Sequence, residues 1–442
     1  MSADATLFLP DSLWDGAAFQ PALALLEREG EILAVGEPKA LAEGHPGAAR
    51  VELPGQALFP GTVNAHNHSF QSLVRGFGDD LDFFGWRDQG IYKHSLHLDA
   101  EGVRTGALLA FAEMLRYGVT TVVDFFYLHG KSNERDLAVI GAAQDLGIRL
   151  VHARCLYDGQ EAPELYRETP ADAVRRTRDL AAHCRQEHGD RHMVTVHPAP
   201  HSPHAASPAM VEAGLALAEE LDTPFHMHMA EGQYEVALTN ELYGLSPLRW
   251  LDSLGGASER ALLVHCVWLD DGELDLMAER GISLLYNPAS NMFLGDGITR
   301  IRAMMDRGIR IALATDGACS NNRTSVFDEM RTCALLQKVT HLDGAVISAE
   351  DVIAMGTSAA GEALRLPIGR LAPGHRADLV SLDLGDISLH PPGPIQKHLV
   401  YAMDPRAITG VWVDGRRIFA DGDLLTVPLA EVTARVRALK RI

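Results

Sequence analysis

The stretch PGTVNAHNHSFQ, residues 60–71, decides how the rest of the chain can be interpreted. It continues an apolar segment that begins at Leu58, and it places His66 and His68 one residue apart. Side chains two positions apart on a β-strand lie on the same face, so both imidazole rings point in the same direction. Buried polar rings need a partner. A metal ion, a carboxylate or a water molecule could serve both.

The stretch belongs to the first of eight short apolar segments, which are separated by segments with helical spacing. In residues 100–118 and 207–221, for example, apolar side chains recur every three or four positions. The eight segments are residues 58–66, 120–126, 149–156, 193–200, 224–231, 261–268, 282–288 and 309–316. Eight strands alternating with helices predict an α/β fold, a (β/α)8 TIM barrel. A doubly wound sheet is the alternative, but no GxGxxG motif follows the first strand.

The two ends of the chain have a different pattern. Residues 21–58 and 371–420 are typical of short strands with turns, including Asp-Gly turns at 414–415 and 421–422. Two distant β-rich ends most simply pair into one small β-sandwich domain beside the barrel. We therefore expect three parts: residues 1–58 and 369–442 as the two halves of the sandwich, and residues 59–368 as the barrel.

Composition limits the possible partners. The chain has 442 residues, with 39 Lys and Arg against 59 Asp and Glu, so its net charge of −20 repels nucleic acids and anionic membranes. Its five cysteines include no CxxC pair, which indicates reduced thiols. The first ten residues lack a basic segment followed by an apolar one, and no apolar run approaches the ~20 residues of a membrane span. These patterns predict a cytoplasmic protein that binds a small molecule, with neither nucleic acid nor membrane as partner.

Polar residues gather at the ends of the predicted strands, where barrel enzymes carry their chemistry. The first strand ends in His66 and His68, and the eighth ends in Asp316. The other candidates follow the fourth, fifth and sixth strands: His197, His201, His204, His226, His228, Glu231 and His265.

Each candidate also has an ordinary structural explanation. His197 or His265 alone could be a hydrogen-bonded core histidine, His226 could support its neighbours, and Asp316 could cap a helix. Their joint position at strand ends, in the chain order of a barrel, favours a metal site. Imidazole nitrogens with one carboxylate suit Zn²⁺, Fe²⁺ or Mn²⁺, and a bound metal lowers the pKa of water from about 15.7 to roughly 7.

Longer motifs resemble the amidohydrolase superfamily, in its branch of metal-dependent deaminases and chlorohydrolases. They are residues 60–76, HMHMAEG at 226–232, NPASNMFLGDGITRI at 287–301, TDGACSNN at 315–322 and GRLAPGHRADLVSLD at 369–383. The resemblance covers nearly the whole chain and implies a homodimer or homotetramer.

The resemblance also implies the roles of individual residues. One divalent metal ion, Zn²⁺ before Fe²⁺ or Mn²⁺, would be held by His66, His68, His228 and Asp316. Asp316 would also act as the general base, Glu231 would shuttle protons, and His265 would hold the attacking water. Binuclear members carry a bridging lysine on the fourth strand, and residues 193–200 contain none, so we expect one metal ion.

Within this branch the chain is similar to deaminases of S-adenosylhomocysteine and methylthioadenosine, of 8-oxoguanine and of guanine, and to formiminoglutamate deiminases. Residues 83–94 and 125–130 resemble the last group, but DGACSNN departs from its pattern. Nucleoside deaminases carry a ribose-binding glutamate after the tryptophan helix, and residues 87–98 have none. We therefore expect a mononuclear hydrolytic deaminase of an amino-substituted purine or pterin, with little activity on adenosine or formiminoglutamate.

Three alternatives stay open. One is a deiminase of a formimino or guanidino amino acid such as formiminoglutamate, and another is a nucleoside deaminase of the S-adenosylhomocysteine/methylthioadenosine type. The third is a binding protein without activity, which the intact motif positions disfavour. Aromatic side chains could stack on a heterocycle, and Arg87 could clamp a carboxylate. The predicted substrate-binding residues are Trp86, Arg87, Tyr92, Tyr127, His129 and His201.

Overall fold

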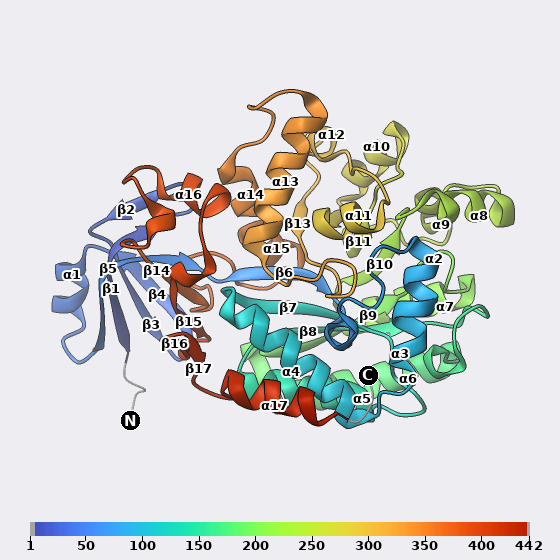
Figure 1. The fold of residues 1–442 in the computed structure, drawn as a ribbon, viewed down its shortest axis with the longest axis horizontal. Helices are drawn as coiled ribbons and strands as arrows, with labels where there is room; N and C mark the ends of the chain where they lie inside the picture. The colour runs from blue at the N-terminus through green and yellow to red at the C-terminus, as the bar shows by residue number, and fades with distance from the viewer. Residues whose placement is uncertain (1–4, 440–442) are drawn as a thin grey trace.

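The computed structural model describes residues 5–439 and divides into a β-rich end and a barrel (Figure 1). The barrel strands are β6 (Thr62–Asn67), β7 (Val119–Phe126), β8 (Arg149–Leu156), β9 (Val194–Pro200), β10 (Phe225–Met229), β11 (Ala261–His265), β12 (Ser283–Tyr286) and β13 (Ile311–Leu313). Each of the eight predicted segments overlaps one of these strands, and the predicted fold class is confirmed.

The barrel consists of two parallel four-stranded halves, β6-β7-β8-β9 and β10-β11-β12-β13. Backbone hydrogen bonds close both seams at the carboxyl ends of the strands. The His228 amide donates to the His201 carbonyl at 2.9 Å, and the Asp316 amide donates to the His66 carbonyl at 3.0 Å. The polar residues singled out from the sequence therefore lie where the two halves of the barrel meet.

Helices surround the barrel and connect its strands (Figure 1). They are α4 (Ala100–Arg116), α5 (Glu134–Leu146), α6 (Pro170–His188), α7 (Pro208–Leu221), α8 (Gln233–Tyr243), α9 (Pro247–Ser253), α10 (Asp271–Arg280), α11 (Pro288–Leu294), α12 (Ile301–Asp306), α13 (Val326–His341), α14 (Ala349–Met355) and α15 (Ser358–Ala363). Local sequence sets several of their ends. At α10, Asp270 and Glu273 form a reciprocal capping box, and Gly281 ends the helix in the left-handed conformation.

One long connection carries much of the site. The segment between β6 and α4 contains a 3-10 helix (Ser69–Val74), the short α2 (Phe83–Gly85), a π-helix (Trp86–Tyr92) and the short α3 (Lys93–Ser95). Short π-helical segments often occur at functional sites. The connection after β8 contains another 3-10 helix at Glu164–Tyr166.

The two chain ends form one nine-stranded sheet, in which β17-β16-β15-β14-β5-β1-β3-β4 are neighbours and β2 pairs with β1. Its strands are β1 (Thr6–Trp14), β2 (Phe19–Pro21), β3 (Ala24–Arg28), β4 (Glu31–Gly36), β5 (Ala49–Pro60), β14 (Leu379–Asp383), β15 (Ile408–Val413), β16 (Arg416–Ala420) and β17 (Asp423–Leu424). The rings of Phe8 in β1 and Trp412 in β15 are 5.6 Å apart, although two strands lie between them. The sheet therefore curls over a shared core, as in a sandwich.

The remaining helices lie beside this sheet or return to the barrel. Helix α1 (Pro38–Gly44) packs on β3, α16 (Ile395–Tyr401) packs on α13, and α17 (Leu429–Ala438) packs on α4 (Figure 1). The domain boundaries at residues 58 and 369 stay predictions. All five cysteines are free and buried. Among residues 5–439, no helix combines the length and the apolar character that crossing a membrane requires.

Candidate metal centre and active site

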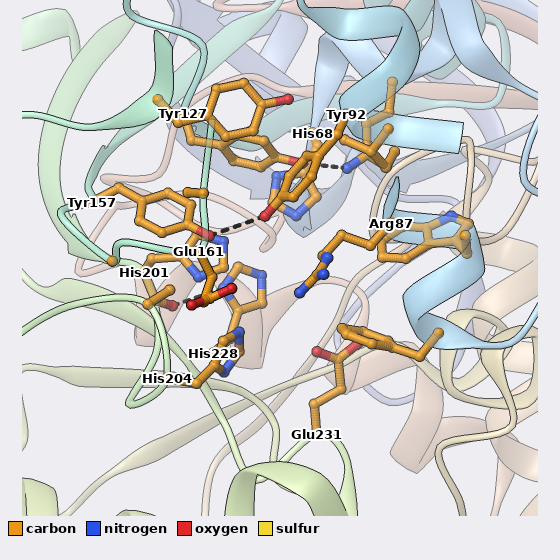
Figure 2. Close-up of a pocket in the computed structure, with 18 of the residues that line it drawn as sticks. His68, Arg87, Tyr92, Tyr127, Tyr157, Glu161, His201, His204, His228 and Glu231 are labelled. Atoms are coloured by element: carbon orange, nitrogen blue, oxygen red, sulfur yellow. Dashed lines mark hydrogen bonds between the residues drawn. The ribbon is translucent and has the colours of Figure 1, made fainter. Parts of the chain in front are cut away.

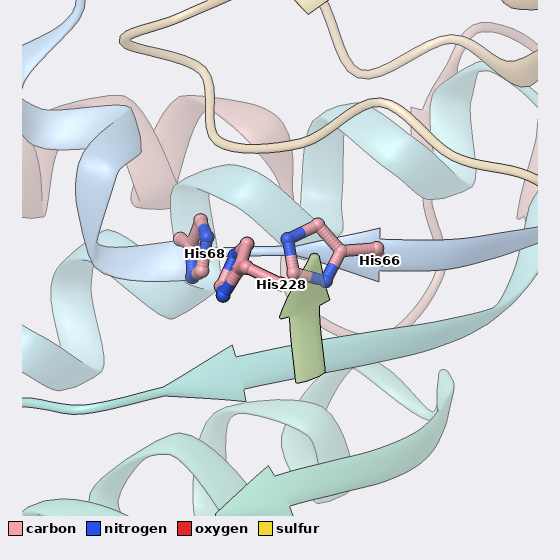
Figure 3. Close-up of side chains that lie close together, drawn as sticks. All are labelled: His66, His68 and His228. Atoms are coloured by element: carbon pink, nitrogen blue, oxygen red, sulfur yellow. The ribbon is translucent and has the colours of Figure 1, made fainter. Parts of the chain in front are cut away.

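Three histidines from two strands meet in the interior of the barrel. His66 lies in β6, His68 follows directly after β6, and His228 lies in β10; their nearest ligand atoms lie within 4.8 Å of one another (Figure 3). The backbone remains extended at His68, so both histidines point to one face, as the opening stretch of the sequence predicts. The closed barrel then brings His228 to the same place.

Backbone carbonyls fix the orientation of two of these rings. His68 Nδ1 donates to the Phe125 carbonyl at 2.6 Å, and His228 Nδ1 donates to the His201 carbonyl at 2.9 Å. This arrangement leaves both Nε2 atoms as acceptors that face the centre. Neither ring nitrogen of His66 has a hydrogen-bond partner in the described structure, and burial lowers its pKa to about 3. A neutral, unpartnered and buried imidazole fits a metal ligand.

Asp316 supplies a carboxylate to the same centre. Its Oδ1 lies 3.4 Å from His66 Nε2 and 3.3 Å from His68 Nε2. Its Oδ2 accepts hydrogen bonds from the hydroxyls of Ser290 at 2.7 Å and Ser320 at 2.8 Å. Burial opposes ionisation of this carboxyl, but the two histidines hold its pKa well below the usual value. Three imidazoles and one carboxylate fit a transition-metal site with an open position.

Glu231 and His265 stand beside this centre. His265 Nε2 lies 3.5 Å from Glu231 Oε1, and His265 Nδ1 donates to the Asn291 side-chain carbonyl at 2.8 Å. Burial raises the pKa of Glu231 well above its ordinary value, and the negative charges of Asp316 and Glu235 raise it further. Its surroundings therefore favour the protonated form of Glu231, whereas those of Asp316 favour the ionised form. An acid and a base thus lie in one site.

The centre opens into a cavity whose wall is largely aromatic (Figure 2). Phe83, Trp86 and Tyr92 come from the connection after β6, and Tyr157 and Tyr166 come from the connection after β8. The ring of Tyr157 lies 4.5 Å from that of His201, which in turn lies 4.8 Å from that of His228. The remaining lining residues are His68, Gln71, Arg87, Ile91, Tyr127, Gly159, Glu161, Ala162, His204, Ala205, Glu231, His265 and Asp316.

The structure brings five of the six predicted substrate-binding residues to this cavity: Trp86, Arg87, Tyr92, Tyr127 and His201. His129 does not line it, and we withdraw that assignment. Its Nδ1 pairs with Asp136, and its Nε2 donates to the Cys155 carbonyl at 3.0 Å. The side chain is buried behind β7 and β8, because its partners come from α5 and β8 and not from the cavity wall.

Several residues of the cavity wall were not predicted from the sequence. They include Tyr157, Glu161 and Tyr166, which follow the third barrel strand. The sequence-based prediction placed substrate contacts only after the first, second and fourth strands. The signal was present, because YDGQEAPELY follows that strand directly.

The histidines without an assigned role separate into two groups. His197 Nδ1 and His226 Nε2 are 3.0 Å apart, and both side chains are buried outside the cavity wall. His204 lines the cavity and pairs with Glu235 at 2.6 Å.

Comparisons with known proteins give matches over most of the chain. The sequence profile described as the amidohydrolase family matches residues 57–418. A 5-methylthioadenosine/S-adenosylhomocysteine deaminase of Nitratidesulfovibrio vulgaris (strain DP4) is 36% identical over 415 residues, which cover 94% of this chain and 91% of the relative. A 5'-deoxyadenosine deaminase of Methanothermobacter thermautotrophicus is 34% identical over 371 residues, which cover 84% and 83%.

A solved structure is similar over the same extent. The crystal structure of an adenosine deaminase from Xanthomonas campestris with bound zinc has a TM-score of 0.90 and 30% identity. The match covers 98% of this chain and 97% of that one. All three of these proteins are named as deaminases of adenosine or of an adenosine derivative.

Proposed function

Because the chain belongs to the amidohydrolase family, we propose that it removes the amino group from the adenine ring of a nucleoside and releases it as ammonia. The chain is a hydrolase of carbon–nitrogen bonds other than peptide bonds, and it acts on a small molecule. The observation that carries the proposal is geometric: Glu231 and His265 stand beside a buried cluster of three histidines and Asp316, at the inner end of the cavity.

The substrate proposed here differs from the one that ranks first from sequence. The sequence favours a free purine or pterin, because no ribose-binding glutamate follows Trp86. The relatives named above favour the nucleoside alternative instead. In the cavity wall the hydroxyls of Tyr92 and Tyr157 lie 3.3 Å apart. These two hydroxyls could form hydrogen bonds with the ribose hydroxyls of a nucleoside in place of the missing glutamate.

We infer that His66, His68, His228 and Asp316 hold one divalent metal ion, with Zn²⁺ before Fe²⁺ or Mn²⁺. When bound, the ion supplies a positive charge that lowers the pKa of water at the site. The donor set supports this assignment, because its ring nitrogens converge and those of His66 have no hydrogen-bond partner among the described residues. Cytoplasmic localisation and a homodimeric or homotetrameric assembly stay predictions.

The chain's own side chains divide the proton transfers. Asp316, which is ionised, takes a proton from the attacking water as the water oxygen bonds to the ring carbon that carries the amino group. His265 accepts a hydrogen bond from that water through Nε2, because Asn291 holds its Nδ1–H. Glu231 donates its proton to the adjacent ring nitrogen. Asp316 passes the proton that it took from the water to the amino group, the carbon–nitrogen bond breaks, and ammonia leaves. The proton of the new hydroxyl group returns to Glu231, which restores the acid and leaves an inosine-type product.

The test combines metal analysis with ammonia release. We expect purified wild-type protein to carry about one equivalent of transition metal and to deaminate adenosine, methylthioadenosine or S-adenosylhomocysteine faster than guanine, a pterin or formiminoglutamate. His228→Ala should lose both metal and turnover, because it removes one ligand. His197→Asn is the matched control, a buried histidine outside the cavity, and it should keep its metal. Faster turnover of guanine, a pterin or formiminoglutamate would refute the nucleoside assignment.

A further inference from the structure

The outer part of the cavity carries one cation and one anion that the proposed chemistry does not use. Arg87 belongs to the π-helix after β6, and Glu161 belongs to the connection after β8. Figure 2 shows the two charged ends directed toward one another across the cavity, with Glu231 and His228 nearby. We propose that this pair binds the zwitterionic α-amino-acid end of a substrate, so that the enzyme prefers adenine nucleosides with an amino-acid tail. This inference rests on the proposed function.

Arg87 is held in place with its terminal nitrogens available. Its Nε donates to Asp88 at 2.7 Å, and its guanidinium carbon lies 5.1 Å from the ring centroid of Phe84 and 5.2 Å from that of Tyr92. The side chain is only 27% exposed. Within residues 5–439, no hydrogen bond uses its two terminal nitrogens. The ring contacts and the hydrogen bond from Nε fix the orientation of the guanidinium group. Its two terminal nitrogens can then bind a carboxylate with two parallel hydrogen bonds.

Glu161 is the complementary group. Among the residues that the structure describes, its carboxylate has neither an ion pair nor a hydrogen bond, yet it lines the same cavity as Arg87. The negative charge of Glu161 and the positive charge of Arg87 both act on the pKa of Tyr92, so both charges lie near that hydroxyl. An unpaired carboxylate at this position suits an ammonium group.

The arrangement selects a ligand that carries both charges. An amino acid presents its carboxylate and its ammonium on one carbon, so a single tail can satisfy both Arg87 and Glu161. A nucleoside with a neutral 5' substituent leaves the half-buried Arg87 and the exposed Glu161 to water, so it forms neither of the two charge-assisted hydrogen bonds. S-adenosylhomocysteine has such a tail and methylthioadenosine does not, although the two share the adenine and ribose groups.

The experiment measures the ratio of kcat/KM for S-adenosylhomocysteine to that for methylthioadenosine. We expect wild-type protein to favour S-adenosylhomocysteine. Arg87→Gln and Glu161→Gln should each reduce the ratio by about ten- to a hundredfold, as expected for a lost hydrogen bond to a charged group. Arg87→Lys should restore part of it. Lys93→Gln and Glu164→Gln are matched controls, since these exposed residues lie near Arg87 and Glu161 in sequence but outside the cavity wall.

The outcomes separate this inference from the proposed function. An equal loss on both substrates would assign Arg87 or Glu161 to the shared ribose or to the local structure, and would overturn the inference. An unchanged ratio would overturn it as well, while deamination of both nucleosides left the proposed function intact. Failure of wild-type protein with its metal to deaminate any adenine nucleoside would refute the proposed function, and the inference with it.

Discussion

At the scale of single residues, the pKa values of the two carboxyl groups beside the histidine cluster are shifted in opposite directions. Burial raises the pKa of Glu231, and the nearby charges of Asp316 and Glu235 are negative and raise it further. Asp316 is equally buried, but His66 and His68 contact it directly and hold its pKa down. Divergent environments of this kind assign acid and base roles within one site.

Replacing Glu231 tests this division. Glu231→Gln keeps the shape of the side chain and removes its exchangeable proton, so we expect kcat to fall by about 10²–10⁴-fold. The histidines and Asp316 are unchanged, and the metal content should therefore match that of the wild-type protein. Steady-state kinetics with metal analysis on the same samples measures both. Loss of metal in Glu231→Gln would instead make Glu231 a ligand.

At the scale of elements, a buried ionic network joins α5 to β7 and β8 behind the cavity. Asp136 of α5 accepts from His152 at 2.9 Å and pairs with His129 at 2.9 Å, and Arg154 lies 3.5 Å away. Arg154 also pairs with Glu168 at 2.8 Å, near the end of the connection that carries Glu161. The network therefore supports the connections that line the cavity.

Removing the charge of Asp136 should loosen this network. Burial opposes ionisation of this carboxyl, but the charges of His129 and Arg154 hold its pKa well below 3.8. Asp136→Asn leaves buried charges without their partner, and we expect a loss of about 3–5 kcal/mol in the free energy of unfolding at pH 7. Denaturant unfolding measures this loss.

A control on the same helix isolates the effect of burial. Asp145 of α5 forms an exposed pair with Arg104, so Asp145→Asn should cost only about 0–1 kcal/mol. The pKa of Asp136 is depressed in the folded state, so its contribution is complete above pH 3.8 and is lost as the pH falls through the folded pKa. Equal effects of the two substitutions at pH 7 would contradict a role for the network.

At the scale of the whole molecule, one buried arginine joins the barrel to the sheet of the chain ends. Arg149, at the start of β8, binds Asp378 with two hydrogen bonds of 3.0 Å each. Its Nη2 also lies 3.3 Å from Asp414, at the turn between β15 and β16. The Asp414 amide in turn donates to Asp378 at 2.8 Å. Strands that are far apart in sequence are thus held together through one side chain.

Replacing Arg149 should destabilise the barrel and the sheet of the chain ends together. Arg149→Gln leaves the buried carboxylate of Asp378 without its cation, whereas Asp414 keeps its ion pair with Arg376. We expect the free energy of unfolding to fall by about 3–5 kcal/mol. Arg178→Gln is the control, because Arg178 and Glu220 form an exposed pair on the barrel surface. Thermal and denaturant unfolding compare the two variants. A loss below 1 kcal/mol for Arg149→Gln would show that apolar packing alone holds the junction.

The sequence by itself determined the class of fold and the histidine cluster. An extended backbone from His66 to His68 places both side chains on one face, because side chains two positions apart on a strand share a face. Eight apolar segments with helices between them leave few arrangements other than a parallel barrel, and such a barrel gathers the ends of its strands. These conclusions depend only on periods of two and of three to four residues, which are local properties of the backbone.

Only the tertiary structure decided which loop residues reach the cavity and which protons they carry. His129 and Glu161 both follow barrel strands, but the path of each loop turns His129 toward Asp136 and leaves Glu161 in the cavity wall. Glu231 has an ordinary pKa in an isolated peptide, and here burial and two neighbouring carboxylates raise that pKa because they disfavour its charge. Both outcomes depend on contacts between distant parts of the chain, and no local sequence period encodes such contacts.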